Sequence, residues 1–151
     1  MIFISHRGNL DGINSADENK PSYIQNALNR DFDVEADIWY FEKSFFLGHD
    51  KPDYLVNDDF LSLKRIWFHA KNIEALNQLN LRGIHCYFHQ NDDVVLTSKG
   101  FLWTYPGKKL TSNSICVMPE LSNEKNFECA GICSDFILDY YKKINNLNEQ
   151  N

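Results

Sequence analysis

The sequence predicts an α/β protein, a reduced (β/α) TIM-like barrel with several outer helices missing. Short apolar segments alternate with helical patterns or polar loops along most of the chain. Nearly every polar candidate residue comes just after one of the apolar segments, and active sites of (β/α)-barrels gather at the carboxyl ends of their strands. A complete barrel usually needs about 250 residues, or about 200 at least. Because this chain has 151 residues, we expect seven or eight strands, with loops in place of several helices.

Length and charge indicate a single domain without a nucleic-acid or membrane partner. We assign residues 1–143 to the barrel and residues 144–151 to a polar C-terminal tail. The net charge of −6, with no basic run, argues against non-specific nucleic-acid binding. No stretch has the length of a transmembrane span and no signal-peptide pattern opens the chain, so we expect no membrane span and a cytoplasmic protein. The cysteines lack the paired spacing of a metal site and are interpreted as buried thiols in a reducing compartment: Cys86, Cys116, Cys129 and Cys133.

The first expected strand covers residues 1–5 and runs straight into His6-Arg7-Gly8. A polar cluster at the carboxyl end of a strand is where βα folds place their chemistry. The following helix is expected to open at Glu18-Asn19, with Pro21 near its first turn.

The second expected strand, residues 33–39, carries a pair of carboxylates. Apolar residues alternate with Glu35 and Asp37, and side chains two apart on a strand point to one side. Burying two like charges is costly unless something positive lies between them, and oxygen ligands suit Mg²⁺ or Ca²⁺. His49 follows after a short hairpin. The alternative is an edge strand whose acidic face lies in water, with His49 as an ordinary loop residue.

Histidines and a lysine occupy the next two expected strands. In residues 65–71, His69 and Lys71 share one side of the strand. In residues 84–90, His89 lies at the carboxyl end, where it either lines the pocket or packs in the core.

Aromatic residues dominate the segment that follows. Residues 94–98 and 100–107 suggest a strand or hairpin in which Trp103 and Tyr105 lie on one side. These rings either stack on a substrate alcohol or sugar face, or belong to the core. The remaining expected elements are a loop with a short helix over 51–64, a helix over 73–81, a strand over 114–118 ending before Glu120, a closing strand over 130–135 ending at Asp135, and a terminal helix over 136–141.

The N-terminal third of the chain resembles a known family. The series His6-Arg7-Gly8, Glu18-Asn19, Val34-Glu35-Ala36-Asp37 and Gly48-His49-Asp50 resembles the signature of the glycerophosphodiester phosphodiesterases. These belong to the wider superfamily of phosphatidylinositol-phospholipase-C-like phosphodiesterases. Order, spacing and the surrounding strand pattern agree over residues 1–50. The resemblance implies a metal-dependent phosphodiesterase that cleaves a small glycerophosphodiester-like or polyol-phosphodiester substrate.

The resemblance also implies roles for individual residues. Glu35 and Asp37 would hold a divalent cation, Mg²⁺ or Ca²⁺. One of His6 and His49 would take a proton from the attacking hydroxyl, and the other would protonate the leaving alkoxide. Arg7 and Lys71 would hold the phosphate. From their places on the expected strands, and not from the resemblance, His89 is expected to line the pocket and Trp103 to contact the substrate.

One position departs from the pattern of the resembled superfamily. There the strand equivalent to residues 65–71 typically ends in acid-x-Lys, and the acid is a third metal ligand. Here His69 stands at the place of the acid. A neutral imidazole favours Mn²⁺ or Zn²⁺ over Ca²⁺. Alternatively the metal keeps two protein ligands and takes water in the third place, or His69 is a core histidine.

Two other classes of function stay open. One is an inactive barrel that binds a phosphorylated ligand, which the departure at His69 and the short chain favour. The other is a metal-dependent sugar-phosphate lyase or isomerase. The apolar surface left bare by missing helices would invite a homodimer.

Overall fold

The computed structural model of the chain describes residues 1–122 and 124–148. Its strands and helices follow in this order: β1 (Ile2–His6), α1 (Pro21–Asn29), β2 (Asp33–Phe41), β3 (Ser44–Leu47), β4 (Tyr54–Val56), α2 (Asp58–Leu61), β5 (Ile66–Ala70), α3 (Ile73–Leu81), β6 (Cys86–Tyr87), β7 (Val94–Leu96), β8 (Leu102–Thr104), β9 (Ser114–Val117), the 3₁₀ turn η1 (Pro119–Leu121), β10 (Gly131–Ser134) and α4 (Ile137–Asn148). None of the helices in these ranges is both long and apolar enough to cross a membrane.

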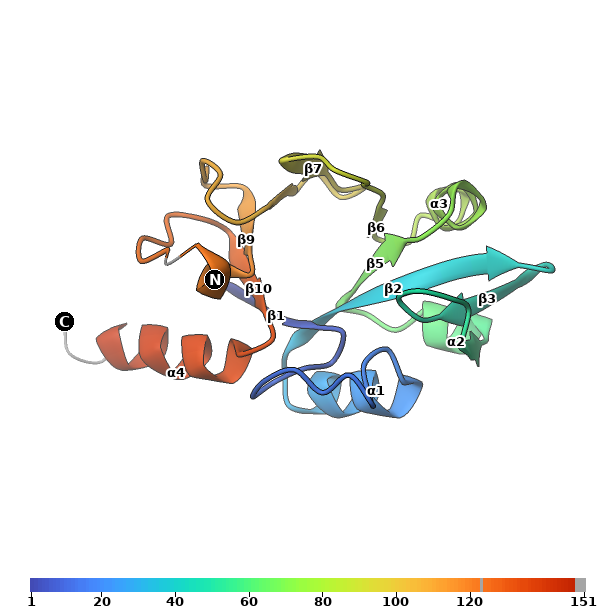
Figure 1. Ribbon diagram of the computed structural model, residues 1–151, viewed down its shortest axis with the longest axis horizontal. Coiled ribbons are helices and arrows are strands. Elements are labelled where there is room, and N and C mark those ends of the chain that lie inside the picture. Colours follow the sequence, from blue (N-terminus) through green and yellow to red (C-terminus); the bar gives the residue numbers. More distant parts are fainter. Residues whose placement is uncertain (123, 149–151) are drawn as a thin grey trace.

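The strands form one curled sheet, a half-barrel that is seen nearly end-on in Figure 1. Seven neighbouring strands run parallel in the order β6-β5-β2-β1-β10-β9-β8. Strand β7 pairs antiparallel with β8 at one end of this series. The remaining two strands, β3 and β4, extend from β2 as antiparallel neighbours.

The expected TIM-like barrel is wrong. That fold needs parallel strands that alternate with helices and close into a ring, whereas this sheet mixes parallel and antiparallel pairs. Within the described residues no strand ladder joins β6 to β7; Ser98, just after β7, exchanges hydrogen bonds of 2.8 and 2.9 Å with Cys86 instead. The connections after β6 and β8 are shorter than the dozen residues of a helical crossover. Loops therefore replace helices there, and the sheet stays open.

Strand β2 is the long element that joins the two parts of the sheet. Its first half lies between β1 and β5, because Val34 pairs with Ser5 on one edge and Ile66 on the other. Beyond Ile38, the edge that β1 occupies is taken over by β3. The β2–β3 hairpin thereby extends away from the curl (Figure 1). Strand β4 lies in a segment where the sequence suggested only a loop and a short helix.

The two faces of the sheet have different neighbours. The outer face packs on helices α1, α3 and α4 through an aliphatic cluster that includes Ile24, Leu79 and Ile137. The inner face is rich in aromatic rings, and its buried hydrophobic residues are Ile4, Trp67, Tyr87, Trp103, Ile115, Val117 and Cys133. The helices lie on the outside of the curl in Figure 1, so the inner face is the concave one.

The terminal helix extends further than the sequence suggested. Helix α4 continues to Asn148 and so crosses residue 143, at which we divided the chain. Most of the expected C-terminal tail is therefore helical, and residues 149–151 lie outside the described ranges.

Gly131 is a position where the sheet requires glycine. A Cβ atom there would lie 2.6 Å from the backbone oxygen of Ile2 and 3.1 Å from Cδ1 of Ile115. Gly131→Ala is therefore expected to destabilise the fold by about 1–3 kcal/mol, the usual cost of overpacking. Urea unfolding measures this change. Ser112→Ala, at an exposed loop position, serves as the control, and equal unfolding midpoints for the two variants would contradict the expectation.

Candidate functional site

The register of the parallel strands gathers the polar candidates on the inner face. His6 pairs with Glu35 across β1 and β2, and Asp37 pairs with His69 across β2 and β5. Partners in a parallel ladder point to the same face of the sheet. Tyr87 of β6 continues the same row beside His69. The site therefore lies near the carboxyl ends of β1, β5 and β6 and at the first half of the longer β2.

Asp37 is the most highly connected side chain of the site. It is fully buried. Its Oδ1 lies 2.9 Å from Nδ1 of His69 and 3.4 Å from Nζ of Lys71. Its Oδ2 lies 2.9 Å from Nε of Arg7 and accepts a 2.9 Å hydrogen bond from Asn19. Burial alone would raise the pKa of Asp37, but the His69 hydrogen bond and the Arg7 charge outweigh it and hold this pKa well below its usual range.

Glu35 is equally buried but poorly partnered. It is 2% exposed, and its Oε2 atom is buried without a hydrogen-bond partner. The nearest groups are Nε2 of His6 at 3.8 Å and, on Oε1, the Tyr87 hydroxyl at 3.5 Å. Burial and the neighbouring charge of Asp37 raise the pKa of Glu35. The acidic pair thus faces the protein interior, and the alternative of an acidic edge in water is wrong.

Glu35, Asp37 and His69 form a group that could hold a divalent cation. Each offers a ligand atom, and these atoms lie within 4.8 Å of one another. The unpartnered Oε2 of Glu35 is the observation that calls for a positive partner. Two carboxylates and one imidazole form a donor set that suits Mn²⁺ and Zn²⁺ as well as Mg²⁺. His69 stands where the resembled superfamily has an acid, and its imidazole still offers a third ligand atom.

His6 is held by a carboxylate from the other end of the chain. Its Nδ1 lies 2.8 Å from Oδ1 of Asp135, just after β10. Burial lowers the pKa of His6, but the Asp135 hydrogen bond and the Glu35 charge outweigh it, so the net shift is upward. Because Asp135 fixes one ring nitrogen, the other nitrogen, Nε2, is directed towards Glu35. This is the arrangement of an oriented acid–base histidine.

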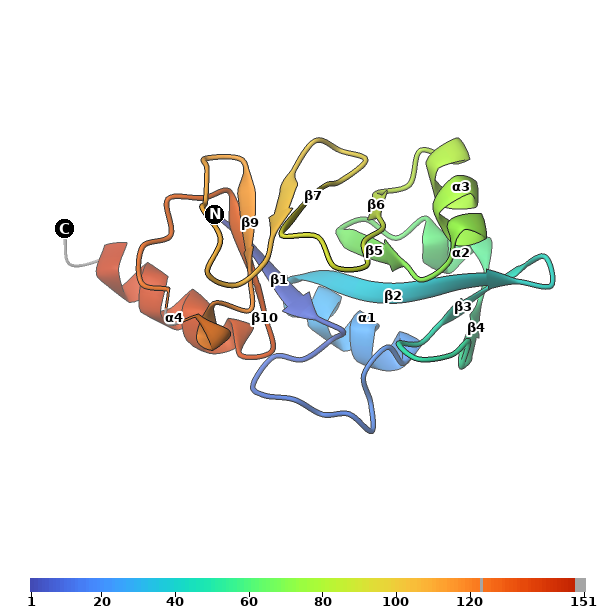
Figure 2. The same cartoon turned by 45° about the horizontal axis from the view of Figure 1, so that its top comes forward.

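The loop after β1 links the two ends of the site. Figure 2 shows this segment (blue) leaving the carboxyl end of β1 before α1 begins. In it the buried Asn9 donates hydrogen bonds of 2.8 Å to both Glu18 and Asp135. Glu18 in turn lies 3.2 Å from Nη1 of Arg7. Asn9 thereby connects Asp135, which bonds His6, with Glu18, which bonds Arg7.

Gly8 allows that loop to turn sharply. Its φ angle is +94°, and a Cβ atom would lie 2.5 Å from Cδ1 of Tyr23 in helix α1. Arg7 just before it also has a positive φ of 54°. The turn directs the Arg7 guanidinium back over β2, where it meets Asp37.

His49 is not in contact with the group formed by Glu35, Asp37 and His69. Its side chain is 43% exposed and pairs with Asp50 at 2.7 Å. Within the described residues, no hydrogen bond or ion pair joins it to Glu35 or Asp37. It does line a pocket of about 220 Å³ that Arg7 also lines. The structure therefore places His6, but not His49, beside the acidic pair; His49 lies at the pocket that Arg7 also lines.

The other expected contacts divide into accessible and buried groups. Lys71 reaches Asp37, and His89 stacks on His69 with ring centroids 4.6 Å apart. Burial and the charges of His69 and Lys71 lower the pKa of His89 to about 4, so this ring is neutral near pH 7. Trp103, expected to contact substrate, is 2% exposed. The structure corrects that expectation: the ring packs in the inner core because it stacks on Tyr87 at 4.7 Å.

Sequence reasoning undervalued several members of the site. Asp135 was expected at a strand end without a role, Asn19 was named only within the Glu18-Asn19 pair, and Asn9 and Tyr87 were given no role. Asn9 directly follows the His6-Arg7-Gly8 motif, and Asn19 belongs to the Glu18-Asn19 pair, so position in the motif was the available signal. Glu120, also at a strand end, accepts hydrogen bonds from Ser134 on both carboxylate oxygens and is structural.

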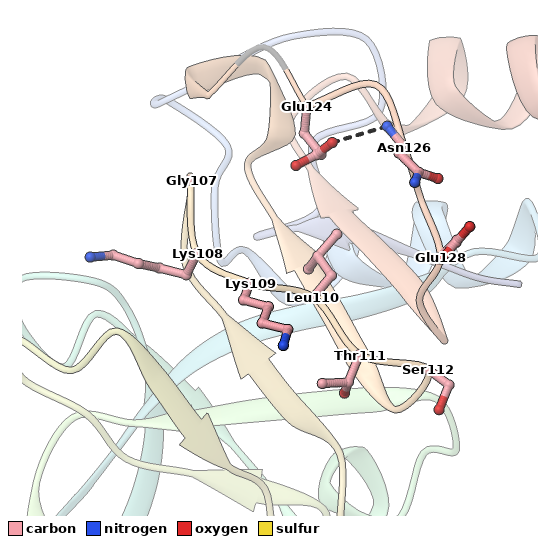
Figure 3. A pocket seen from close by; sticks show the side chains of 9 residues that line it. All are labelled: Gly107, Lys108, Lys109, Leu110, Thr111, Ser112, Glu124, Asn126 and Glu128. Carbon is pink, nitrogen blue, oxygen red and sulfur yellow. Dashed lines mark hydrogen bonds between the residues drawn. The ribbon is translucent and has the colours of Figure 1, made fainter.

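A larger depression lies away from this site. It has a volume of about 610 Å³ and lies between residues 107–112 and the segment around Glu124 to Glu128 (Figure 3). Lys108, which helps to line it, pairs with Asp93 at 2.8 Å. The depression is lined mainly by exposed loop residues, so volume alone does not make it the functional site.

Comparison of the chain with protein-family models finds no match, and neither the curated proteins nor the solved structures yield one. Fold and site together define the protein as an α/β half-barrel with a buried group of Glu35, Asp37 and His69 on its inner face, beside the side chains of Arg7 and Lys71.

Proposed function

We propose that the protein is a metal-dependent phosphodiesterase that cleaves a small glycerophosphodiester-like or polyol-phosphodiester substrate. The observation that carries this proposal is the proximity of three kinds of group on one face. An oriented acid–base residue, His6, lies 3.8 Å from Glu35 of the cation-binding group, and Arg7 and Lys71 both reach Asp37 of the same group. The resemblance of residues 1–50 to the glycerophosphodiester phosphodiesterases points to the same chemistry.

The two cations have donors left for a phosphate. Arginine carries five N–H donors and lysine three. Arg7 donates a hydrogen bond to Glu18 through Nη1, its Nε lies 2.9 Å from Asp37 without a hydrogen bond, and Lys71 has one contact with Asp37. The remaining donors hold the non-bridging oxygens of the substrate. A divalent cation on Glu35, Asp37 and His69 would supply further neutralisation of the phosphate charge.

Proton transfer falls to His6 and His49. Asp135 keeps the Nδ1 side of His6 occupied, so Nε2 is the nitrogen that exchanges a proton with the substrate. His49, at the pocket that Arg7 lines, serves the opposite end of the phosphodiester. One of them removes a proton from the attacking hydroxyl and the other protonates the leaving alkoxide.

Hydrolysis of two substrates tests the proposal. The full chain is treated with EDTA and then assayed with bis(p-nitrophenyl) phosphate and glycerophosphocholine in Mg²⁺, Ca²⁺ or Mn²⁺. We expect turnover of at least one substrate that depends on added metal. No turnover with any of the three metals would contradict the proposal.

A binding protein without catalysis is the second candidate. One observation favours it: without any ion, Asp37 already lies beside the positive charges of Arg7 and Lys71 and accepts a hydrogen bond from Asn19. A site that balances its own charge has less need of a metal. Binding of inorganic phosphate or a phosphate monoester without turnover, measured by calorimetry, would favour this candidate.

The metal preference should depend on His69. His69→Glu introduces an oxygen ligand where the imidazole lies 2.9 Å from Asp37. We expect the variant to gain activity with Ca²⁺ relative to Mn²⁺, because carboxylates suit Ca²⁺ and imidazole suits transition metals. The ratio of rates in the two metals measures the change. An unchanged ratio would show that His69 does not bind the metal.

Two further expectations remain proposals. All four cysteines are free, which suits a reducing compartment such as the cytoplasm. A homodimer stays a prediction, and light scattering that gives the mass of a monomer would contradict it.

A further inference from the structure

A series of aromatic rings adjoins the cation-binding group. We define it as the aromatic wall: His69, Tyr87, His89, Trp103 and Tyr105. His69 stacks on Tyr87, with ring centroids 5.0 Å apart and planes 1° apart. It also contacts His89, whose ring lies 4.6 Å from that of Tyr105. The wall thus begins at a candidate metal ligand and continues away from it.

The wall has a buried base and a partly accessible end. Tyr87 and Trp103 are buried in the inner core, whereas His89 and Tyr105 keep part of their surface exposed. A ligand can therefore contact only the outer pair directly, while the inner pair supports them. Trp103 and Tyr105 lie two residues apart at β8, which places them on one side of the chain.

One polar atom of this outer pair lacks a hydrogen-bond partner. The Nδ1 atom of His89 is buried and has no hydrogen-bond partner. Its ring and that of Tyr105 are tilted by 49° to one another, so they do not form a parallel slot. A flat nucleobase would stack on only one of the two rings. A puckered ring can present a C–H face to the Tyr105 ring and a hydroxyl to the partly exposed imidazole of His89.

We propose that His89 and Tyr105 form the subsite for a saturated, hydroxyl-bearing ring, a pyranose, which is one of the alcohols esterified to the phosphate. This inference rests on the proposed phosphate site at Arg7 and Lys71. An acyclic glycerol lacks a face to stack, and a quaternary ammonium group lacks a hydroxyl for His89. Lys71 and His69 lie on the same side of β5 and its extension, so the phosphate and the ring can be bound side by side.

Binding of phosphate monoesters to the full chain tests the subsite. Calorimetry compares glucose 1-phosphate with glycerol 3-phosphate, phosphocholine, AMP and inorganic phosphate. We expect glucose 1-phosphate to bind about tenfold more tightly than glycerol 3-phosphate, the gain typical of one aromatic contact. The fluorescence of Trp103, which stacks on Tyr87 in the wall, should change with the sugar phosphate only.

Variants of Tyr105 identify the surface responsible. Tyr105→Ala should remove the tenfold advantage and leave the affinity for inorganic phosphate unchanged, and Tyr105→Phe should retain the advantage because it keeps the ring. Circular dichroism confirms that both variants are folded. Tighter binding of AMP or phosphocholine, equal binding of the sugar and glycerol esters, or an advantage that survives Tyr105→Ala would overturn the subsite. A Tyr105-dependent advantage without hydrolysis of any phosphodiester would support the subsite and count against the catalytic function alone.

Discussion

Replacing His6 with glutamine is expected to lower the rate of phosphodiester cleavage by about 10²- to 10⁴-fold, the usual contribution of a positioned acid or base. The glutamine side chain can still accept or donate a hydrogen bond near Asp135, which lies 2.8 Å from His6, but it cannot transfer a proton. The turnover number for bis(p-nitrophenyl) phosphate in saturating Mn²⁺ measures the loss. The fold should be retained, because the change keeps a polar group at the end of β1.

Two further variants define the role of His6. Asp135→Asn should also lower the turnover number, because an amide no longer stabilises the charged imidazole and no longer selects its tautomer. His85→Gln is the matched control, since His85 bonds Thr97 at 3.0 Å and lies outside the proposed machinery. Unimpaired turnover in His6→Gln would refute the role proposed for this residue. The corresponding test of His49 is His49→Ala, for which we also expect loss of cleavage.

Glu35→Gln is expected to weaken Mn²⁺ binding more than the roughly 10- to 100-fold that loss of an outer-sphere partner costs a metal site. The change keeps the size of the side chain and removes the charge of the carboxylate whose Oε2 has no hydrogen-bond partner. Calorimetric titration with Mn²⁺ measures the affinity. Glu74→Gln, at an exposed position of α3, is the matched control and should bind Mn²⁺ like the unaltered protein.

Glu35→Gln should not destabilise the protein in the absence of metal. Burial and the charge of Asp37 raise the pKa of Glu35 above its unfolded value. A carboxyl group with a raised folded pKa costs stability once the pH exceeds that unfolded value, and the cost is complete above the folded pKa. Glutamine removes the cost at neutral pH. The melting temperature of EDTA-treated Glu35→Gln should therefore equal or exceed that of the unaltered protein, and a large decrease would show that Glu35 is purely structural.

The strands were the most predictable part of the fold. Alternating residues around Glu35 and Asp37 identified β2, and the apolar residues of β1 and β5 identified their neighbours. The helix expected over 73–81 is α3, and the side chain of Asn72 caps it by accepting a hydrogen bond from the amide of Ala75. Helix α1 begins at Pro21, three residues after the expected start at Glu18, because Glu18 and Asn19 are used by the site instead.

The closure of the sheet could not be inferred from local patterns. A run of parallel strands is compatible with both a closed barrel and an open half-barrel. The difference depends on whether the strands at the two ends of the series pair with each other. Here the contact is made by Ser98 with Cys86 rather than by a strand ladder. The direction of β7 was equally hidden, because residues 94–98 show no feature that distinguishes an antiparallel strand from a parallel one.

The site was predictable where motif and register coincide. Glu35, Asp37 and His69 lie on strands whose register follows from a parallel pairing, and the structure brings them together. His49 follows β3, a strand that runs antiparallel to β2. The orientation of its side chain is therefore set by the loop after β3 and by the neighbouring Asp50. The burial of Trp103 depends on Tyr87, which is distant in sequence and therefore invisible to a local pattern.

Anomalous diffraction from crystals soaked in Mn²⁺ tests the central proposal most directly. We expect a single strong peak bound by Glu35, Asp37 and His69, with Arg7 and Lys71 on the side open to phosphate. A peak elsewhere, or no peak while Asp37 keeps all of its present contacts with Arg7, His69 and Lys71, would contradict the proposed metal site.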